Sequence, residues 1–330
     1  MSLYDLETER VIREIKRLKA DFVGLQFPEG LKTRAVELAE IIESETDATA
    51  VISADPCFGA CDVSDRKMKG MVDLIIHYGH TPFPIDYEVP VIFIEARSGV
   101  DIRGVLEDAA RLLDGHERVG LATTAQHLHL LDEAASFLEE RGFEVVRGRG
   151  VNTAEGQVLG CNFSAIRDTD ADAYLFIGSG NFHPLGIKLL TGRDVVVADP
   201  YHGEVRRVDE FADRVLRIRF ARINRASSAR RWGIIVSSKE GQRRFKLAIE
   251  IKRKLESAGR DAFIFLLENV SPEALLPFRD IEAFVVTACP RIAIDDSQIY
   301  DRPLLNPSEL EIALGEREWE DYVLDEIIFS

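Results

Sequence analysis

The stretch Phe22-Val-Gly-Leu-Gln-Phe27 is a short apolar run that stops at Pro28-Glu-Gly30. Apolar residues at helical spacing follow in 35–42, and a second short run, Thr49-Ala-Val-Ile52, comes next. A strand, a helix and a second strand in this order form a βαβ unit with parallel strands. This stretch therefore predicts an α/β fold built on a parallel sheet.

The same alternation recurs along the rest of the chain. Further strand-like runs lie at 74–77, 91–94, 119–122, 144–146, 173–177, 195–197, 232–236, 263–265 and 283–286. Helical patterns lie at 6–18, 63–69, 101–114, 208–224 and 242–258, and a further one runs through Phe137. The loops 26–30, 123–126 and 237–241 follow first strands, and the loops 77–80, 178–180 and 287–289 follow third strands. This internal repeat predicts three related α/β domains, 1–103, 104–215 and 216–330, each with a parallel four-stranded sheet.

Composition and charge limit the functional classes. The chain has 330 residues and a formal net charge of −16, which argues against binding to nucleic acid, since such proteins usually carry a basic patch. No stretch reaches the roughly 18 uninterrupted apolar residues of a membrane span. The start, Met1-Ser-Leu-Tyr-Asp-Leu-Glu7, lacks the basic and apolar parts of a signal peptide. With only four cysteines, a cytoplasmic protein without a disulfide framework is expected.

Three of the four cysteines are candidate metal ligands. Cys61, Cys161 and Cys289 each lie beside glycine or proline at the end of an apolar run, one in each predicted domain. Ligands bind at the carboxyl ends of parallel strands, where all three loops are expected. If the domains surround a pseudo-threefold axis, the thiolates converge on a central metal-cluster site. Thiolates suit iron–sulfur clusters or zinc, and three protein ligands leave one metal position open.

Several motifs resemble those of a known family. They are Phe58-Gly-Ala-Cys-Asp62, Ile76-His-Tyr-Gly-His80, Thr123-Thr-Ala-Gln-His127, Gly156-Gln-Val-Leu-Gly-Cys161, Phe176-Ile-Gly-Ser-Gly180, Phe182-His-Pro-Leu-Gly186, Ala288-Cys-Pro-Arg291 and Asp295-Asp296. In this order they resemble the archaeal diphthamide-synthesis radical enzymes, the 2-(3-amino-3-carboxypropyl)histidine synthases. The resemblance extends over nearly the whole chain.

The resemblance implies a cytoplasmic homodimer that starts diphthamide synthesis. In this family each domain gives one cysteine, here Cys61, Cys161 and Cys289, to a [4Fe-4S] cluster whose fourth iron meets S-adenosylmethionine (SAM). The reduced cluster, supplied by an electron donor, breaks the Cγ–S bond of SAM. The resulting 3-amino-3-carboxypropyl radical adds to the imidazole of a histidine in translation elongation factor 2. Cys57 lies outside the motif and is expected to be a spare thiol, although its place four residues before Cys61 makes ligand exchange conceivable.

The resemblance and the loop positions together suggest SAM contacts, whereas no catalytic side chain is identified. The candidates are Gly79, His80, Gly178, Ser179, Gly180, His183, Ser237, Gln242, Arg291 and Asp296. The glycines allow close approach of a ligand, but tight turns would explain them equally well. Arg291 could pair with the SAM carboxylate. The two histidines would contact SAM, relay a proton or simply bond to loop carbonyls.

Two other functions fit parts of the pattern. Quinolinate synthase, a dehydrating condensation enzyme, has the same plan of three α/β domains and three cysteine ligands. A non-catalytic zinc scaffold or partner subunit would also use such thiols. The apolar tail Val323-Leu-Asp-Glu-Ile-Ile-Phe329 is expected to pack within or between subunits.

Overall fold

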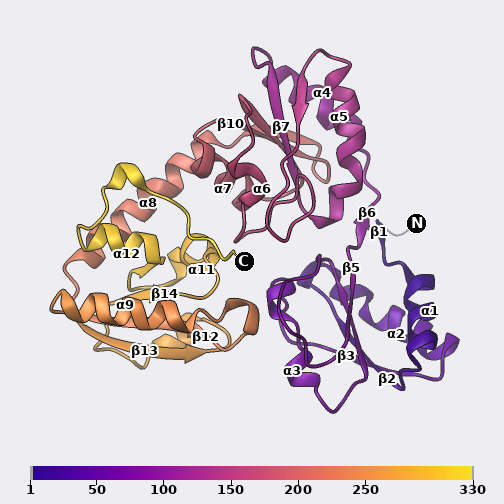
Figure 1. Ribbon diagram of the computed structural model, residues 1–330, viewed down its shortest axis with the longest axis horizontal. Helices are drawn as coiled ribbons and strands as arrows, with labels where there is room; N and C mark the ends of the chain where they lie inside the picture. The colour runs from indigo at the N-terminus through magenta and orange to yellow at the C-terminus, as the bar shows by residue number, and fades with distance from the viewer. Residues whose placement is uncertain (1–2, 329–330) are drawn as a thin grey trace. The chain divides into compact units, whose positions relative to one another are not determined.

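Three parallel sheets form the framework of the chain, as the fold prediction required. A computed structural model describes residues 3–328 (Figure 1). The first sheet has the order β3-β2-β4-β5, the second β11-β10-β9-β7-β8 and the third β13-β12-β14-β15. The strands of the first sheet are β2 (Phe22–Gln26), β3 (Thr49–Ile52), β4 (Leu74–Tyr78) and β5 (Val91–Ile94). The second has β7 (Arg118–Thr123), β8 (Glu144–Val146), β9 (Ala173–Ile177), β10 (Asp194–Asp199) and β11 (Glu204–Arg207). The third has β12 (Arg231–Ser237), β13 (Asp261–Leu267), β14 (Ala283–Val286) and β15 (Leu304–Leu305).

Each sheet uses the same strand order. Counting parallel strands along the chain, the second lies beside the first, the first beside the third, and the third beside the fourth. The second sheet adds a fifth strand, β11, antiparallel to β10, where four strands were predicted. The sequence of β11, Glu204-Val-Arg-Arg207, is mostly charged and carries no apolar run that would signal a strand. A short antiparallel pair, β1 (Tyr4–Asp5) and β6 (Arg97–Ser98), stands apart from the three sheets.

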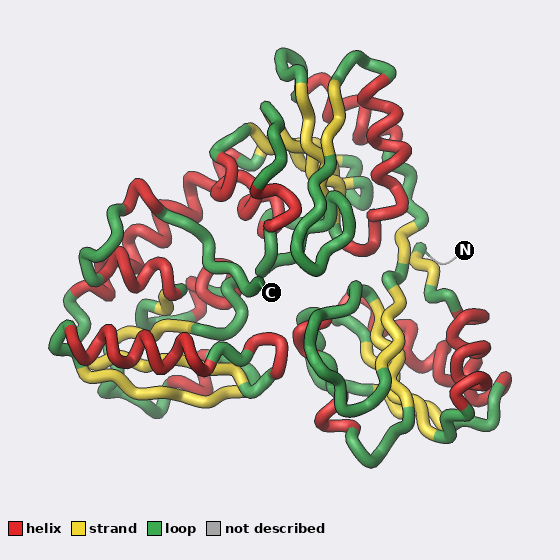
Figure 2. Tube along the Cα trace, viewed as in Figure 1, coloured by secondary structure: helices red, strands yellow, loops and turns green. Residues whose placement is uncertain are grey.

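Helices connect the strands (Figure 2). The α-helices are α1 (Thr8–Leu18), α2 (Ala35–Glu45), α3 (Asp65–Met68), α4 (Arg103–Leu112), α5 (Leu131–Glu139), α6 (Ser164–Arg167), α7 (Phe182–Thr191), α8 (Asp209–Ser227), α9 (Phe245–Ser257), α10 (Pro272–Leu275), α11 (Arg291–Asp295) and α12 (Pro307–Ala313). The 3₁₀ helices are η1 (Glu29–Arg34), η2 (Ala60–Asp62), η3 (Ala125–Leu130), η4 (Glu240–Gln242), η5 (Ser297–Ile299) and η6 (Trp319–Asp321). Within residues 3–328, none of these helices has the length and apolar character of a membrane span.

The chain divides into two compact units, Met1–Asp101 with Thr124–Asp132, and Ile102–Thr123 with Glu133–Ser330. The first unit contains the first sheet, and the second contains the other two. Helix α8 places Ala212 and Val215 in the core of the second sheet and Ile223 and Ala226 in that of the third. The predicted division at 215/216 thus falls inside one continuous helix. The three-domain boundaries and the pseudo-threefold axis stay predictions.

An identical hydrogen-bond pattern marks the start of each repeat. An acidic side chain just before the third strand accepts hydrogen bonds from two successive backbone N–H groups at the start of the first strand. Asp73 accepts from residues 21 and 22, Asp172 from 117 and 118, and Glu282 from 230 and 231. Because strand ends otherwise leave such groups exposed, the carboxylate fixes how the first and third strands begin.

A glycine is the third residue of each first strand. At Gly120 a Cβ atom would lie 2.4 Å from the Tyr174 ring, and at Gly233 it would lie 2.4 Å from the Phe284 ring. Gly24 is similarly close to the side chains of Met68 and Ile75. In the second and third sheets a ring of the third strand occupies the place where a Cβ would stand, and in the first sheet Met68 of α3 and Ile75 of the third strand share that place, so the glycine is a packing requirement.

We expect Gly120→Ala to lower the free energy of unfolding by about 1–3 kcal/mol, because the new methyl group overlaps a ring inside a packed core. Urea unfolding followed by circular dichroism would measure the change. Gly104→Ala is the matched control, because Gly104 lies in α4 with no atom within 4 Å of a built Cβ. Alanine there should stabilise the helix by about 0.5–1 kcal/mol. A loss at residue 120 no larger than the effect at residue 104 would contradict the packing argument.

Candidate metal centre

The carboxyl ends of the first and third strands carry buried polar groups in each sheet. These two parallel neighbours flank the point where the order of strands along the sheet reverses, which is where open parallel sheets bind ligands. Gln26 pairs in register with His77 in the first sheet, and Thr123 with Ile177 in the second. Ser237 ends the first strand of the third sheet and is fully buried. Each sheet therefore has buried polar residues at the edge where ligands were predicted to bind.

Cys61 lies in η2, between the second and third strands of the first sheet. Its loop is held to the first strand, because the Gln26 amide donates to the Asp62 carbonyl at 2.8 Å. A Cβ at Gly59 would lie 3.4 Å from Cys61 Sγ, so this glycine leaves room beside the thiol. Cys61 is half-buried, as a ligand open to an incoming cluster should be.

Cys161 occupies a tight turn between β8 and β9. Leu159 and Asn162 exchange two backbone hydrogen bonds of 3.0 and 3.2 Å, which leaves Gly160 and Cys161 at the tip. The thiol is half-buried.

Cys289 follows β14 and precedes α11, whose first turn includes a 3.2 Å hydrogen bond from Ile292 N to Cys289 O. Burial raises the pKa of the Cys289 thiol. A soft metal would reverse this effect, because a coordinated thiol is deprotonated. All four cysteines of the chain are thiols in this structure.

Within the second unit, the loops of Cys161 and Cys289 lie next to each other. Gly160 packs against Arg291, since a Cβ at Gly160 would stand 2.8 Å from Arg291 Cδ and 3.5 Å from the Phe182 ring. Arg291 also lies over the Phe182 ring, 4.8 Å from its centre. Residues 160 and 291 are each within two positions of a candidate ligand cysteine. The Cys161 and Cys289 loops, which are far apart in the sequence, are therefore in contact.

The carboxyl-terminal segment joins the same two loops. Ile327 N donates to Cys161 O at 2.7 Å, and Glu326 accepts from Phe163 N. Arg244 donates to Thr287 O at 2.8 Å, to Ala288 O and to Asp325. This confirms packing within the subunit for part of the predicted apolar tail, whereas Phe329 lies outside the described residues. The role of Arg244 was not predicted, because nothing in its local sequence marks it.

The candidate SAM contacts occupy several positions. Gly79, Gly178 and Gly180 have positive φ angles of 81°, 143° and 81°, so their turns account for these glycines. Ser179 is exposed, Ser237 is buried, and Gln242 is buried in η4. Asp296 ends α11, and burial raises its pKa.

Two candidates already have protein partners. Arg291 directs Nε and Nη2 at Asp295, at 2.8 and 2.7 Å, so a bidentate pair with a SAM carboxylate would require Asp295 to be displaced. His183 stacks on Phe176 with ring centres 5.8 Å apart and planes 8° apart. Burial, and secondly the charge of Arg291, lower the pKa of His183 to about 3, so its imidazole is neutral at pH 7.

A neutral buried histidine makes stability depend on pH. Because the pKa of His183 is lower in the folded than in the unfolded chain, where it is about 6.5, acid favours unfolding. Stability should be complete above pH 6.5 and fall as the pH approaches 3. His183→Gln should flatten the decline in the free energy of unfolding by at most about 1.4 kcal/mol per pH unit between pH 6 and 4.

Urea unfolding at several pH values would test this slope. His202→Gln is the control, because Asp199 raises the pKa of exposed His202 and this residue cannot cause loss of stability in acid. Equal slopes for the wild type and His183→Gln would contradict the buried neutral state.

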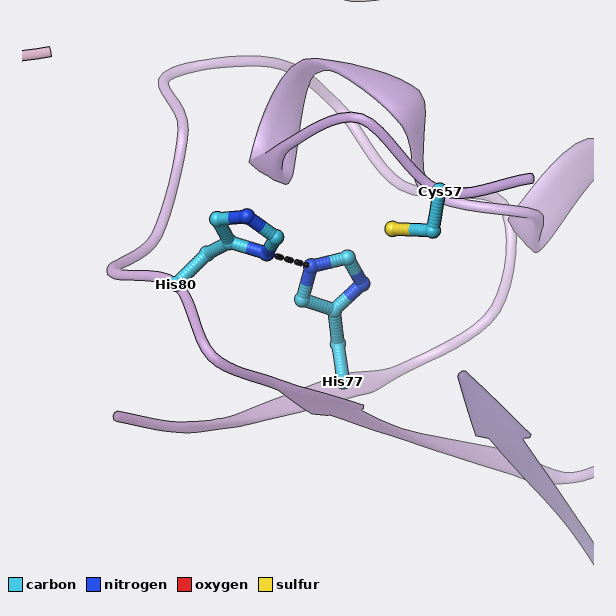
Figure 3. Close-up of side chains that lie close together, drawn as sticks. All are labelled: Cys57, His77 and His80. Carbon is cyan, nitrogen blue, oxygen red and sulfur yellow. Dashed lines mark hydrogen bonds between the residues drawn. The ribbon is translucent and has the colours of Figure 1, made fainter. Parts of the chain in front are cut away.

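A second cluster of ligand-type side chains was not predicted. The ligand atoms of Cys57, His77 and His80 lie within 4.8 Å of one another, at the carboxyl end of the first sheet (Figure 3). His80 was expected to contact SAM or a loop carbonyl; it bonds through Nδ1 to His77 Nε2 at 2.9 Å and also has a backbone hydrogen bond with Tyr78. Burial lowers the pKa of His80 to about 4 and that of His77 well below its usual value. Sequence spacing hides this cluster, because residues 57 and 77 meet only through the sheet.

Comparison with known proteins gives a consistent result. Residues 27–323 match the family described as "Putative diphthamide synthesis protein". The 2-(3-amino-3-carboxypropyl)histidine synthase of Pyrococcus horikoshii is 39% identical over 330 residues, covering 99% of this chain and 94% of that protein. The synthase of Methanocaldococcus jannaschii is 30% identical, covering 95% and 91%. The crystal structure of Dph2 from Pyrococcus horikoshii with a 4Fe-4S cluster matches with a TM-score of 0.92 and 38% identity, covering 99% of this chain and 95% of that one.

Proposed function

The chain belongs to the diphthamide synthesis protein family, and on this premise we propose that Cys61, Cys161 and Cys289 are the three protein ligands of its [4Fe-4S] cluster. The enzyme transfers the 3-amino-3-carboxypropyl group of SAM to a histidine, in the first step of diphthamide synthesis. Its protein substrate is elongation factor 2, the carrier of that histidine.

The adjacency of the Cys161 and Cys289 loops carries this proposal. Gly160 against Arg291 brings together two half-buried thiols that are 128 residues apart in the sequence. Three soft thiolates match the preference of iron–sulfur clusters and leave the fourth iron open for SAM. When bound, the cluster supplies the electron that cleaves the Cγ–S bond of SAM.

The chain's own residues have supporting tasks in this proposal. The turn at 178–180 and the first turn of α7 offer backbone N–H groups and His183 to SAM. Neutral His183 can accept or donate one hydrogen bond without adding charge. Gly79, His80, Ser237, Gln242 and Asp296 complete the proposed contact set, together with Arg291 once Asp295 releases its guanidinium. A homodimer, a separate electron donor and a cytoplasmic location also stay proposals.

Anaerobic reconstitution tests this function. The protein is loaded with iron and sulfide, reduced with dithionite, and mixed with SAM and elongation factor 2. Elongation factor 2 heavier by one aminocarboxypropyl group, with methylthioadenosine released, is the expected result. Release of 5′-deoxyadenosine would show that a different SAM bond breaks.

The two other functions are distinguished by further measurements. A quinolinate synthase would make product from iminoaspartate and dihydroxyacetone phosphate, and the family match argues against it. A zinc scaffold would stay colourless after anaerobic purification and would contain zinc in place of iron at the three cysteines.

A further inference from the structure

Cys57, His77 and His80 come from three segments that meet at the end of the first sheet. Cys57 lies in the loop after β3, His77 is in β4, and His80 follows the turn at Gly79. Figure 3 shows both imidazoles and the thiol converging on one point. Cys57 is 3% exposed, His77 is fully buried and His80 is half-buried. Neither Cys57 nor His77 is a ligand of the proposed cluster.

The surrounding residues orient His77 as a ligand. The amide of Gln26 is fixed by three bonds, since its nitrogen donates to Asp62 O and Ser64 Oγ and its oxygen accepts from Ser64 N. The same oxygen is 3.0 Å from His77 Nδ1, so that nitrogen carries the proton. Nε2 of His77 is left with a lone pair directed at His80. Metal-binding histidines are usually held by such a bond to a carbonyl oxygen.

The donor atoms lie close to the spacing that a small soft cation requires, and binding would move them slightly. Tetrahedral zinc, with bonds of about 2.0–2.3 Å to nitrogen and sulfur, places its ligand atoms about 3.3–3.6 Å apart. Here the two ring nitrogens are 2.9 Å apart and all three donor atoms lie within 4.8 Å of one another. Small side-chain rotations would replace the His77–His80 hydrogen bond with two metal bonds. His80 would then carry its proton on Nε2, and the Cys57 thiol would release one proton to solvent.

One donor of this cluster borders a surface cavity. His80 lines a surface cavity of about 430 Å³ within the first unit. The carboxylates of Glu7 and Glu95 also line it, and each is paired with an arginine of the same cavity, Arg10 and Arg97. The loop bearing Cys57 is held by Lys32, which donates to Ala54 O and Asp55 O. The Cys57 loop is therefore supported, and His80 is the donor that borders the cavity.

We propose that Cys57, His77 and His80 form a site for a zinc-class divalent cation, separate from the three-cysteine cluster site. Three protein ligands leave the fourth position to water. The bound metal would link β4 to the loop that leads into Cys61. This proposal does not depend on the three-cysteine cluster, whose ligands are different residues, but a zinc-bound His80 would not contact SAM.

The test uses zinc alone as the probe. In the full chain carrying Cys61→Ala, Cys161→Ala and Cys289→Ala, Cys57 is the remaining thiol. Titration against a coloured chelator should show one zinc per chain, and X-ray absorption should show one sulfur and two nitrogen ligands. Cys57→Ser or His80→Ala should weaken binding by more than about 100-fold, and Gln26→Leu by about 10- to 100-fold, as expected for a supporting residue.

A control and a second measurement keep the test decisive. His129→Gln removes an exposed histidine of the same unit and should leave zinc affinity unchanged. If the triple variant does not fold, metal analysis of the iron-loaded protein replaces it, and Cys57→Ser should lose zinc while keeping iron. Absence of zinc binding by folded protein, or binding that Cys57→Ser leaves intact, would overturn the proposal.

Discussion

Replacing Cys61, Cys161 or Cys289 with alanine should abolish transfer of the aminocarboxypropyl group. Each thiolate is a proposed ligand to one iron, and no second thiol lies within two residues of any of them. A loss of at least about 1,000-fold in rate, equivalent to about 4 kcal/mol of activation free energy, is expected for each variant. The measurement is mass spectrometry of elongation factor 2 after anaerobic reconstitution, with iron and sulfide assayed on the same samples.

Cys57→Ala separates the cluster ligands from the fourth thiol. Cys57 belongs to the histidine pair in the first sheet, so its loss should leave the iron and sulfide content intact. The three ligand variants should instead lose iron and the brown colour together. Full iron content in Cys161→Ala would contradict this assignment, because Cys57 would then be able to replace a proposed ligand. Loss of iron in Cys57→Ala would contradict it too, because Cys57 would then itself be a ligand.

The sheets could be predicted from the sequence because their strands are short, continuous apolar runs. The predicted strands 91–94, 144–146, 173–177 and 283–286 coincide with β5, β8, β9 and β14. Parallel strands buried on both faces have this composition. Helix α7 was missed, because Pro184 and Gly186 normally signal a loop. Pro184 stands in its first turn, where no N–H is needed, and Gly186 makes room for the Phe163 ring.

The site was only partly predictable, because its contacts are tertiary. The three cysteine loops could be placed at the carboxyl ends of strands from the alternation of elements alone. The contact of Gly160 with Arg291 and the bonds of Arg244 to the carboxyl-terminal segment depend on how two sheets pack. The pairing of His77 with Cys57 likewise requires the register of β4. Local patterns carry no such information.

Arg219→Met should destabilise the protein by about 3–5 kcal/mol, because it leaves a carboxylate buried without its cation. Arg219 and Glu309 are both fully buried and form two hydrogen bonds of 2.7 and 2.6 Å. Arg219 also donates to Ala293 O and Leu304 O. One side chain of α8 thus joins α11, β15 and α12 of the third sheet. Urea unfolding would measure the loss.

Two further variants decide whether the buried charge is the cause. Arg222→Met removes an arginine one turn along α8 that donates to Ser297 O, and it should cost no more than about 1–2 kcal/mol. Adding Glu309→Gln to Arg219→Met should recover part of the loss, because no charge is then left unpaired. If the double variant is as unstable as the sum of both singles, the loss comes from packing. Since Ala293 lies four residues after Cys289, Arg219→Met should also weaken iron binding, and recovery of stability should restore it.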